Sequence, residues 1–402
     1  MKSILFLADG MADEPLAELG GKTPLEYAKT PNMDKIAKNG ANGLFLSLPE
    51  GFPTSSDVAN MSILGYDLSK YYPGRGPIEA VSQGIKLAPD DIAFRCNLVH
   101  TKDGVLVDYS AGHVLNESAE AMMLDIQAHF GSDKVTFHSG VSYRNIMVLH
   151  GKEFSLNIEC QKPDSCQGMK LSELDPMFTD NSFEAKITVQ FIKEITTKTA
   201  EFLAKHHLNK GVKNPANSIW VHSPGKSPAL PKFKDLYEGK KGAIISAVDV
   251  IFGLGICAGM DVIKVPGATG YIDTNYKGKA DAAVSALEDH DFVYLHVEAI
   301  DECSHMGDLK LKLKAIEDYD SKIVGPVLSA LEGRNDISFA LLPDHPVPVK
   351  LKKHTRTPVP VAIISPYVSP DSITSYSEKE AEKGSLGLMK NNELIKLLLN
   401  IK

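Results

Sequence analysis

The amino-acid sequence predicts an α/β fold: a mostly parallel sheet with helices on both faces, plus an inserted α+β domain. Two patterns lead to this prediction. Short apolar runs alternate with helical stretches near both ends of the chain, as is typical of parallel sheets covered on both faces. Between these regions the alternation stops, and several strand-like runs precede one long amphipathic helix. The 402 residues also exceed a single small core and fit two domains.

The N-terminal segment is predicted to alternate between strand and helix. The expected elements are strands at residues 3–8 and 43–48 and helices at about residues 24–39 and 57–64. Pro31 stands where it can start the second part of the first helical stretch. The run Tyr71-Tyr-Pro-Gly-Arg-Gly-Pro77 consists of turn-forming residues and marks a change of organisation.

The middle of the chain is predicted to have its own small sheet. Strand-like runs lie at residues 92–99, 104–108, 134–139, 144–149 and 155–160, with a helical stretch at about 117–130 among them. A long helix is expected from about Ser182 to Leu208, because Ile187, Phe191 and Ile195 recur at helical spacing.

Strict alternation returns near residue 214. Strands are expected at 218–222, 243–246, 292–297, 337–342 and 361–365, with helices at about 248–257, 279–289, 309–331 and 391–401. We therefore predict one α/β domain from residues 1–70 and 214–402, with residues 71–213 inserted as a second domain. The alternative is two consecutive domains split near residue 214. That arrangement would separate Asp9 from Asp301 and Asp344, so we prefer the insertion.

Composition excludes several classes of protein. Hydrophobic content of 43% and charged content of 23% are ordinary for a globular protein. The formal net charge of −8 argues against nucleic-acid and acidic-membrane partners. No apolar run approaches the roughly 18 residues that span a bilayer, and the N-terminus lacks a signal-peptide layout. Five scattered cysteines without a CxxC pair favour reduced thiols over a Cys160–Cys166 disulfide, and hence a cytoplasmic protein.

Acidic and histidine side chains recur where three predicted strands end. They are Asp9 after strand 3–8, Asp301 and His305 after strand 292–297, Asp344 and His345 after strand 337–342, and His354 shortly beyond. Ligands of open α/β sheets gather at this edge. Taken singly, each motif also fits a simple turn or surface loop. Together they predict a site for two divalent ions, and mixed carboxylate and imidazole ligands suit Mn²⁺, Zn²⁺, Fe²⁺ or Co²⁺ better than Ca²⁺.

The loop between the second strand and the second predicted helix carries hydroxyl groups. Ser55, Ser56 and Asp57 all have the character of helix N-caps, and capping alone is one interpretation. The functional interpretation is a nucleophile, because divalent cations stabilise a neighbouring alkoxide. A helix N-terminus would also attract a phosphoryl group.

A series of motifs along the chain resembles one family of enzymes. The motifs are Asp9-Gly10, Pro53-Thr-Ser-Ser-Asp-Val-Ala-Asn-Met-Ser-Ile-Leu-Gly-Tyr-Asp67, Gly74-Arg-Gly-Pro-Ile-Glu79, Phe94-Arg-Cys-Asn-Leu98, Asp108-Tyr-Ser-Ala-Gly112, Ile245-Ser-Ala-Val-Asp249, Pro266-Gly-Ala-Thr-Gly270, Asp301-Glu-Cys-Ser-His-Met-Gly-Asp308 and Pro343-Asp-His345. In these motifs, and over nearly its whole length, the sequence resembles the archaeal-type, cofactor-independent phosphoglycerate mutases of the alkaline phosphatase superfamily.

The resemblance implies an alkaline-phosphatase-like α/β metal domain with an inserted substrate-binding lid domain. It implies interconversion of 2-phosphoglycerate and 3-phosphoglycerate through a phosphorylated Ser56, rather than Ser55, with no need for 2,3-bisphosphoglycerate. One ion would be held by Asp9, Ser56, Asp344 and His345, and the other by Asp301, His305 and His354. Mn²⁺ is the first candidate, with Mg²⁺, Co²⁺ or Zn²⁺ as alternatives. The expected partner is the small phosphoglycerate substrate, and the oligomeric state is not predicted.

The substrate's carboxylate and phosphate need fixed cations. The candidates are Arg75, Arg95, Arg144 and, more weakly, Lys226, each of which can otherwise be a surface ion-pair partner. Two positions depart from the family. His113 stands where Arg is frequent. Cys303 stands in the metal loop where a small residue is usual, so it is either a small spacer or an oxidation-sensitive thiol.

Three alternative functions stay open at this point. A phosphopentomutase or a metal-dependent phosphomonoesterase of the same superfamily would use the same metal domain. A non-catalytic metal- or anion-binding protein would also keep the scaffold, although the complete ligand set argues against it. Turnover of 3-phosphoglycerate, compared with pentose phosphates and an aryl phosphate, would separate these functions.

Overall fold

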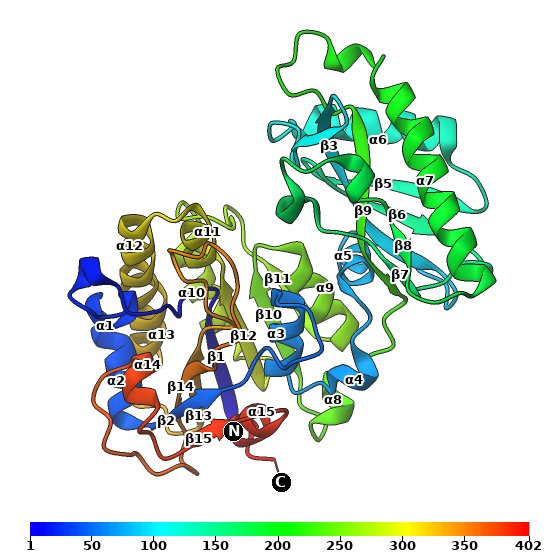
Figure 1. The fold of residues 1–402 in the computed structure, drawn as a ribbon. Coiled ribbons are helices and arrows are strands. Elements are labelled where there is room, and N and C mark those ends of the chain that lie inside the picture. The colour runs from blue at the N-terminus through cyan, green and yellow to red at the C-terminus, as the bar shows by residue number, and fades with distance from the viewer. Residues whose placement is uncertain (402) are drawn as a thin grey trace. The chain divides into compact units, whose positions relative to one another are not determined.

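The computed structural model, which describes residues 1–401, divides the chain into two compact units (Figure 1). Unit 1 combines Met1–Tyr72 with the segment that begins at Leu230, and unit 2 comprises Pro73–Ala229. The predicted end of the insertion, at residues 213–214, is therefore wrong. Strand β9 (Ser218–Lys226) pairs with β3 (Ile92–Lys102) in unit 2, and an apolar run by itself does not reveal which strand it will pair with.

Unit 1 is built on one eight-stranded sheet, in the order β11-β10-β12-β1-β13-β14-β2-β15. Its strands are β1 (Lys2–Ala8), β2 (Ala41–Phe45), β10 (Gly242–Ser246), β11 (Asp261–Lys264), β12 (Phe292–Val297), β13 (Ile337–Leu342), β14 (Val359–Ile364) and β15 (Gly387–Met389). All neighbouring pairs are parallel except those that β14 makes with β13 and β2. The predicted α/β class with a mostly parallel sheet is confirmed.

Helices cover both faces of this sheet (Figure 1). The helices of unit 1 are α1 (Pro24–Tyr27), α2 (Pro31–Asn39), α3 (Ser56–Ile63), α4 (Leu68–Tyr71), α8 (Phe233–Leu236), α9 (Asp249–Ala258), α10 (Tyr276–Ala286), α11 (Ala299–Met306), α12 (Leu309–Tyr319), α13 (Gly325–Ala330), α14 (Glu378–Ala381) and α15 (Glu393–Leu399). Ile4 and Phe6 of β1 share a core with α2, α10, α12 and α13. Side chains alternate along a strand, so α9 and α15 pack on the opposite face.

The helix predicted at 309–331 is interrupted. Between α12 and α13 the segment Asp320–Val324 forms one π-helical turn. Pro326 lacks the N–H that an α-helix would use here. The turn also places Asp320 at the start of α2, where its Oδ1 accepts hydrogen bonds from the backbone nitrogens of Asn32 (3.0 Å) and Met33 (2.7 Å). The interruption therefore caps a helix that lies far away in the sequence.

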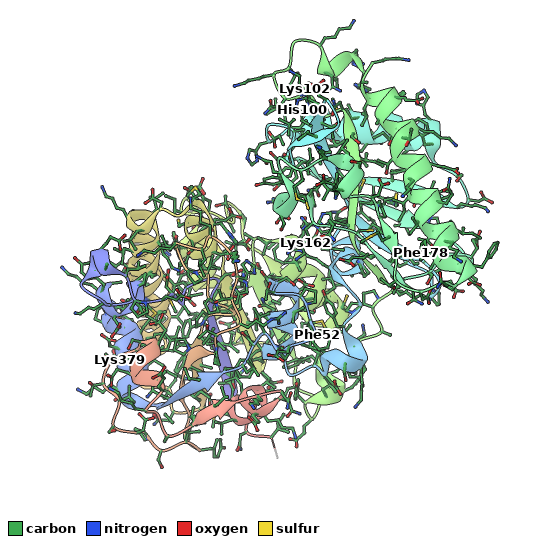
Figure 2. The ribbon with its side chains drawn as sticks, viewed as in Figure 1. Phe52, His100, Lys102, Lys162, Phe178 and Lys379 are labelled. Carbon is green, nitrogen blue, oxygen red and sulfur yellow. The ribbon has the colours of Figure 1, made fainter. Side chains whose placement is uncertain are left out.

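Unit 2 is an α+β unit with an antiparallel sheet of β3, β4, β5, β6 and β9. Its other elements are α5 (Arg75–Ser82), β4 (Val105–Asp108), α6 (Asn116–Phe130), β5 (Val135–Val141), β6 (Arg144–Leu149), β7 (Ile158–Glu159), β8 (Met177–Phe178) and α7 (Phe183–Leu203). The strand predicted at 155–160 shrinks to β7, which pairs only with β8. The partly exposed Phe178 of β8 is labelled in Figure 2.

The structure bears on the expectations about the cysteines and about membrane-spanning helices. All five cysteines are free thiols, so Cys160 and Cys166 are not joined. Among residues 1–401, no helix combines the length and the apolar character needed to cross a bilayer.

A buried ion pair joins two loops at the carboxyl edge of the unit 1 sheet. Lys312 Nζ of α12 lies 2.8 Å from Asp13 Oδ2, and both side chains are fully buried. The same ammonium donates a hydrogen bond to the carbonyl oxygen of Val347 (2.9 Å). It thereby ties the loop after β1 to the loop after β13.

We predict that Lys312→Met destabilises the protein by about 3–5 kcal/mol, because it leaves the Asp13 carboxylate buried without a counter-ion. Lys314→Met on the same helix is the control. Lys314 pairs with Asp318 but is half exposed, and exposed pairs contribute only about 0–1 kcal/mol. Urea denaturation monitored by circular dichroism compares the two variants, and equal losses would contradict the prediction.

Candidate metal centre and active site

Three adjacent parallel strands bring the predicted acidic residues together. In the order β12-β1-β13, Ala8 is in register with Val297, and Leu7 with Leu342. The loops that carry Asp9, Asp301 and Asp344 therefore start side by side. Gly10 is required here: its φ is +66°, and a Cβ atom would lie 2.7 Å from the Cα atom of Asp301. Only glycine permits this approach.

The first cluster gathers around His345. Its Nε2 atom lies 3.2 Å from Ser56 Oγ, 3.3 Å from Asp344 Oδ2 and 3.5 Å from Asp9 Oδ1. The side chains of Asp9, Asp344 and His345 are almost fully buried. Four potential ligand atoms from three separate stretches of the chain thus converge on one point.

The second cluster lies beside the first and is formed by Asp301, His305 and His354. His305 Nε2 is 3.4 Å from Asp301 Oδ2, and His354 Nε2 is 3.6 Å from Asp301 Oδ1. Ligand atoms of these three residues all lie within 4.8 Å of one another, and the same is true of Asp9, Asp301 and His345. Asp301 therefore belongs to both groups, which places the two clusters next to each other.

Without a bound cation, the buried charges of this centre would be unfavourable. Burial, together with the charges of Asp344 and Asp301, raises the pKa of Asp9 well above its usual value. Burial also raises the pKa of Asp344 to about 7. Burial alone would lower the pKa of His305, but its hydrogen bond and charge interaction with Asp301 raise it to about 9. Buried carboxylates at such close range repel one another unless cations separate them.

The donor set fits divalent metal ions. Among the described residues, Asp9 Oδ1 and Asp301 Oδ1 are buried and accept no hydrogen bond. Buried polar atoms are normally satisfied, and an unsatisfied carboxylate oxygen costs free energy unless a cation binds it. Carboxylate oxygens and imidazole nitrogens suit first-row transition ions.

The structure separates the roles of Ser55 and Ser56. Ser56 is the first residue of α3, and its hydroxyl faces His345. Ser55 stands at the N-cap position, but its buried hydroxyl makes no capping hydrogen bond, so the capping interpretation of Ser55 is wrong. Arg356 fixes the preceding loop through a hydrogen bond from Nη1 to the carbonyl oxygen of Pro49 (2.7 Å).

Sequence reasoning missed the residues that orient the candidate ligands. His296 of β12 lies with Nε2 3.0 Å from Asp9 Oδ2 and Nδ1 3.0 Å from Ser246 Oγ. Burial, with the charge of Lys279, lowers the pKa of His296 to about 3, so its ring is neutral. The available signal was a histidine inside an otherwise apolar strand, five positions before Asp301.

Two of the predicted substrate-binding arginines meet on one buried carboxylate in unit 2. Arg75 Nε lies 2.7 Å from Glu79 Oε1, and Arg95 Nε lies 3.0 Å from Glu79 Oε2. Burial raises the pKa of Glu79, but the charges of Arg95 and Arg75 outweigh this effect and lower it overall. Arg144 adds to the same field and lies 4.7 Å from the ring centroid of Tyr143. Lys226 lies exposed at the end of β9.

The structure shows the surroundings of Cys303 and His113, the two residues that depart from the family pattern. The Cys303 side chain is fully buried in α11, and burial raises the pKa of its thiol to about 11. This environment favours a small spacer over a reactive thiol, since the thiolate is the reactive species. His113 lies in unit 2 with its ring centroid 5.8 Å from that of Tyr143.

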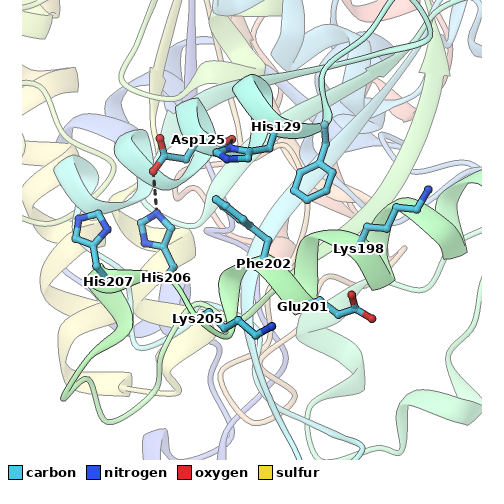
Figure 3. Close-up of a pocket in the computed structure, with 9 residues that line it drawn as sticks. Asp125, His129, Lys198, Glu201, Phe202, Lys205, His206 and His207 are labelled. Carbon is cyan, nitrogen blue, oxygen red and sulfur yellow. Dashed lines mark hydrogen bonds and ion pairs between the residues drawn. The ribbon is translucent and has the colours of Figure 1, made fainter.

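A cavity in unit 2 is not lined by any predicted site residue. It has a volume of about 650 Å³ and lies between the C-terminal ends of α6 and α7. Figure 3 shows His206 and Phe202 beneath Asp125 and His129. His206 Nε2 lies 3.0 Å from Asp125 Oδ2, and the His129 ring packs 4.6 Å from that of Phe202. These contacts account for the histidines as packing between the two helices.

Comparison with known proteins shows the family to which the chain belongs. Residues 1–401 match the model of the Metalloenzyme superfamily. The chain is 46% identical to the 2,3-bisphosphoglycerate-independent phosphoglycerate mutase of Methanosarcina acetivorans, over 100% of both chains. It is 44% identical to a probable enzyme of the same name from Geobacter sulfurreducens, again over 100% of both. The chain belongs to the family of 2,3-bisphosphoglycerate-independent phosphoglycerate mutases.

Solved structures agree with this membership. The cofactor-independent phosphoglycerate mutase of Thermoplasma acidophilum has a TM-score of 0.66 at 30% identity, with 100% of this chain and 99% of that chain covered. A Pyrococcus horikoshii protein reaches a TM-score of 0.83, also at 30% identity, with 99% and 96% covered. The resemblance to this mutase family predicted from sequence motifs is confirmed, and membership of a metalloenzyme superfamily implies that the chain binds divalent metal.

We predict that this mutase centre binds Mn²⁺ more weakly as the pH falls from about 9 through about 7. Below the raised pKa values of His305 (about 9) and Asp344 (about 7) these groups carry protons, and a metal ion must displace the protons in order to bind. Apparent affinity therefore rises with pH across this window. Isothermal titration calorimetry in two buffers of different ionisation enthalpy gives both the affinity and the number of protons released. An affinity independent of pH, with no proton release, would contradict the prediction.

Proposed function

We propose that this chain interconverts 2-phosphoglycerate and 3-phosphoglycerate through a phosphoserine on Ser56, in a centre with two divalent ions and without 2,3-bisphosphoglycerate. The convergence of Ser56 Oγ, Asp9, Asp344 and His345, beside the second cluster of ligands, is the observation that carries the proposal. The names of the full-length relatives point to the same reaction.

The two clusters suggest how the ions are shared. One ion would be held by Asp9, Ser56, Asp344 and His345, and the other by Asp301, His305 and His354. When bound, the ions would neutralise the phosphoryl oxygens and favour the ionised Ser56 hydroxyl. Mn²⁺ is the first candidate, with Mg²⁺, Co²⁺ and Zn²⁺ as alternatives. A titration of the metal-free protein with each ion, followed by elemental analysis, gives the identity of the bound ions and their number per chain.

The reaction needs two phosphoryl transfers at one nucleophile. Ser56 Oγ forms a bond to phosphorus while the bond from phosphorus to the substrate oxygen breaks, and that oxygen takes up a proton. Glycerate then turns, and its other hydroxyl attacks the phosphoserine, so that Ser56 is released. The position of Ser56 in the first turn of α3 favours this step, because a helix N-terminus attracts the negative phosphoryl group.

We further propose that unit 2 is the substrate-binding lid and that Arg75, Arg95, Arg144 and Lys226 supply the cations for the substrate. Arg75 and Arg95 share one buried carboxylate, Glu79, and Arg144 adds to the same field, so the cluster keeps an excess of positive charge. Guanidinium groups match a carboxylate or phosphate with paired hydrogen bonds. Retaining glycerate against water is what distinguishes a mutase from a phosphatase.

A phosphomonoesterase is the second candidate, because Ser56, activated by bound ions, would be able to attack phosphate esters in general. The names of the relatives favour the mutase. The deciding test is turnover of 3-phosphoglycerate in an enolase-coupled assay without added bisphosphoglycerate, with release of inorganic phosphate measured in parallel. The cytoplasmic location and the absence of nucleic-acid and membrane partners stay predictions.

Ser56→Ala is expected to reduce mutase activity by several orders of magnitude, because no other group can carry the phosphoryl. Ser55→Ala is the matched control, since Ser55 is the neighbouring buried hydroxyl without a hydrogen-bond partner among the described residues. The enolase-coupled rate and the incorporation of phosphate into the protein are the measurements. If Ser55→Ala loses activity and Ser56→Ala keeps it, the nucleophile has been assigned wrongly.

Arg75→Ala and Arg95→Ala are expected to slow the mutase reaction far more than hydrolysis of a small aryl phosphate. Each substitution removes a charged anchor that contributes about 1.5–3 kcal/mol per hydrogen bond, and released glycerate would raise the ratio of hydrolysis to mutase flux. The exposed Arg334, paired with Asp336 in unit 1, provides the control Arg334→Ala. Equal loss of both reactions would mean that Arg75 and Arg95 support the fold instead.

A further inference from the structure

Asn60 is a fully buried amide one helical turn after Ser56, and the mechanism above does not use it. Its Nδ2 donates hydrogen bonds to the carbonyl oxygen of Ser56 (2.8 Å) and to Asp344 Oδ2 (3.0 Å). Its Oδ1 accepts a hydrogen bond from the hydroxyl of Tyr294 on β12. Both N–H groups and the carbonyl oxygen are therefore engaged, and these partners fix the orientation of the amide.

The hydrogen bond from Asn60 completes the environment of Asp344. The other carboxylate oxygen, Oδ1, already accepts backbone hydrogen bonds from Gly10 (3.2 Å) and His345 (2.8 Å). Oδ2 is the oxygen that lies 3.3 Å from His345 Nε2, inside the first cluster. A neutral donor on this oxygen favours the ionised carboxylate that a metal needs, and it adds no competing charge.

We propose that Asn60 is a positioning residue that joins the nucleophile to a metal ligand. Through one amide it holds Asp344 Oδ2 in place and connects it to the backbone of Ser56, so that the hydroxyl and the carboxylate keep their mutual geometry. Tyr294 supports this role from the neighbouring strand, because its hydroxyl prevents the amide from rotating. The inference rests on the proposed roles of Ser56 and Asp344.

The chain offers a closely matched control. Asn42 is also buried in unit 1, and its Nδ2 likewise donates to one backbone carbonyl oxygen, that of Ala37 (2.9 Å), and to one carboxylate, Asp371 Oδ1 (2.9 Å). Asp371 is not part of either metal cluster. Asn42→Ala therefore removes the same chemistry at a similar depth without touching the proposed centre.

The test is titration of metal-free, full-length protein with Mn²⁺ in the absence of substrate, for the wild type, Asn60→Ala, Asn42→Ala and Tyr294→Phe. Loss of a partner that orients a metal ligand typically weakens metal affinity about 10–100-fold. We expect a weakening in that range for Asn60→Ala, a smaller one in the same direction for Tyr294→Phe, and none for Asn42→Ala. Thermal unfolding of the metal-free proteins should show losses of similar size for Asn60→Ala and Asn42→Ala.

Two results would contradict the positioning role of Asn60. Wild-type Mn²⁺ affinity in Asn60→Ala, or equal weakening in Asn60→Ala and Asn42→Ala, overturns the positioning role. If Asn60→Ala does not fold, Asn60→Ser takes its place, because a serine hydroxyl cannot bridge the same two acceptors, and wild-type affinity in that variant is equally decisive. Failure of the wild type to bind Mn²⁺ at all would instead count against the proposed function, so the two failures can be told apart.

Discussion

The mutual repulsion of buried carboxylates at one sheet edge is the constraint on which the rest of the structure depends. Asp9, Asp301 and Asp344 follow three adjacent strands, and the parallel register of β12, β1 and β13 leaves them no room to separate. Burial is the larger cause of the raised pKa values of Asp9 and Asp344, and the charges of the neighbouring carboxylates raise them further. A fold that buries three carboxylates together must hold them in place by contacts with other groups. It must also admit cations that neutralise their charge.

The surrounding contacts supply that support. Gly10 lets the loop after β1 approach the backbone of Asp301, and the buried Lys312–Asp13 pair ties this loop to the loop after β13. His296 orients one carboxylate and Asn60 another, each through a neutral donor. Neutral donors matter because a further charge inside the cluster would either compete with the metal ions or add to the repulsion.

The sequence predicted that the acidic residues lie together, because their positions follow a local rule. Apolar runs show where strands end, and ligands of an α/β sheet collect at those ends, so Asp9, Asp301 and Asp344 could be placed together without coordinates. The contacts that orient them could not, because they join residues far apart in the chain. His296, Asn60 and Glu79 lie inside a strand or a helix, where a single polar residue also fits ordinary packing. The partner of β9 escaped prediction because strand pairing joins residues far apart in the chain.

The candidate sites of the two units are built from groups of opposite charge, and this difference suggests how specificity arises. In unit 1 a cluster of acids requires cations, and a serine hydroxyl activated by bound cations would be able to attack many phosphate esters. Such a centre has little means of choosing its substrate. In unit 2 Arg75 and Arg95 share the carboxylate of Glu79, and the charge of Arg144 adds to the same field. If this cationic cluster binds the substrate's carboxylate, as we propose, substrate selection takes place in unit 2 and phosphoryl transfer in unit 1, and each unit can meet its own electrostatic requirement without compromising the other.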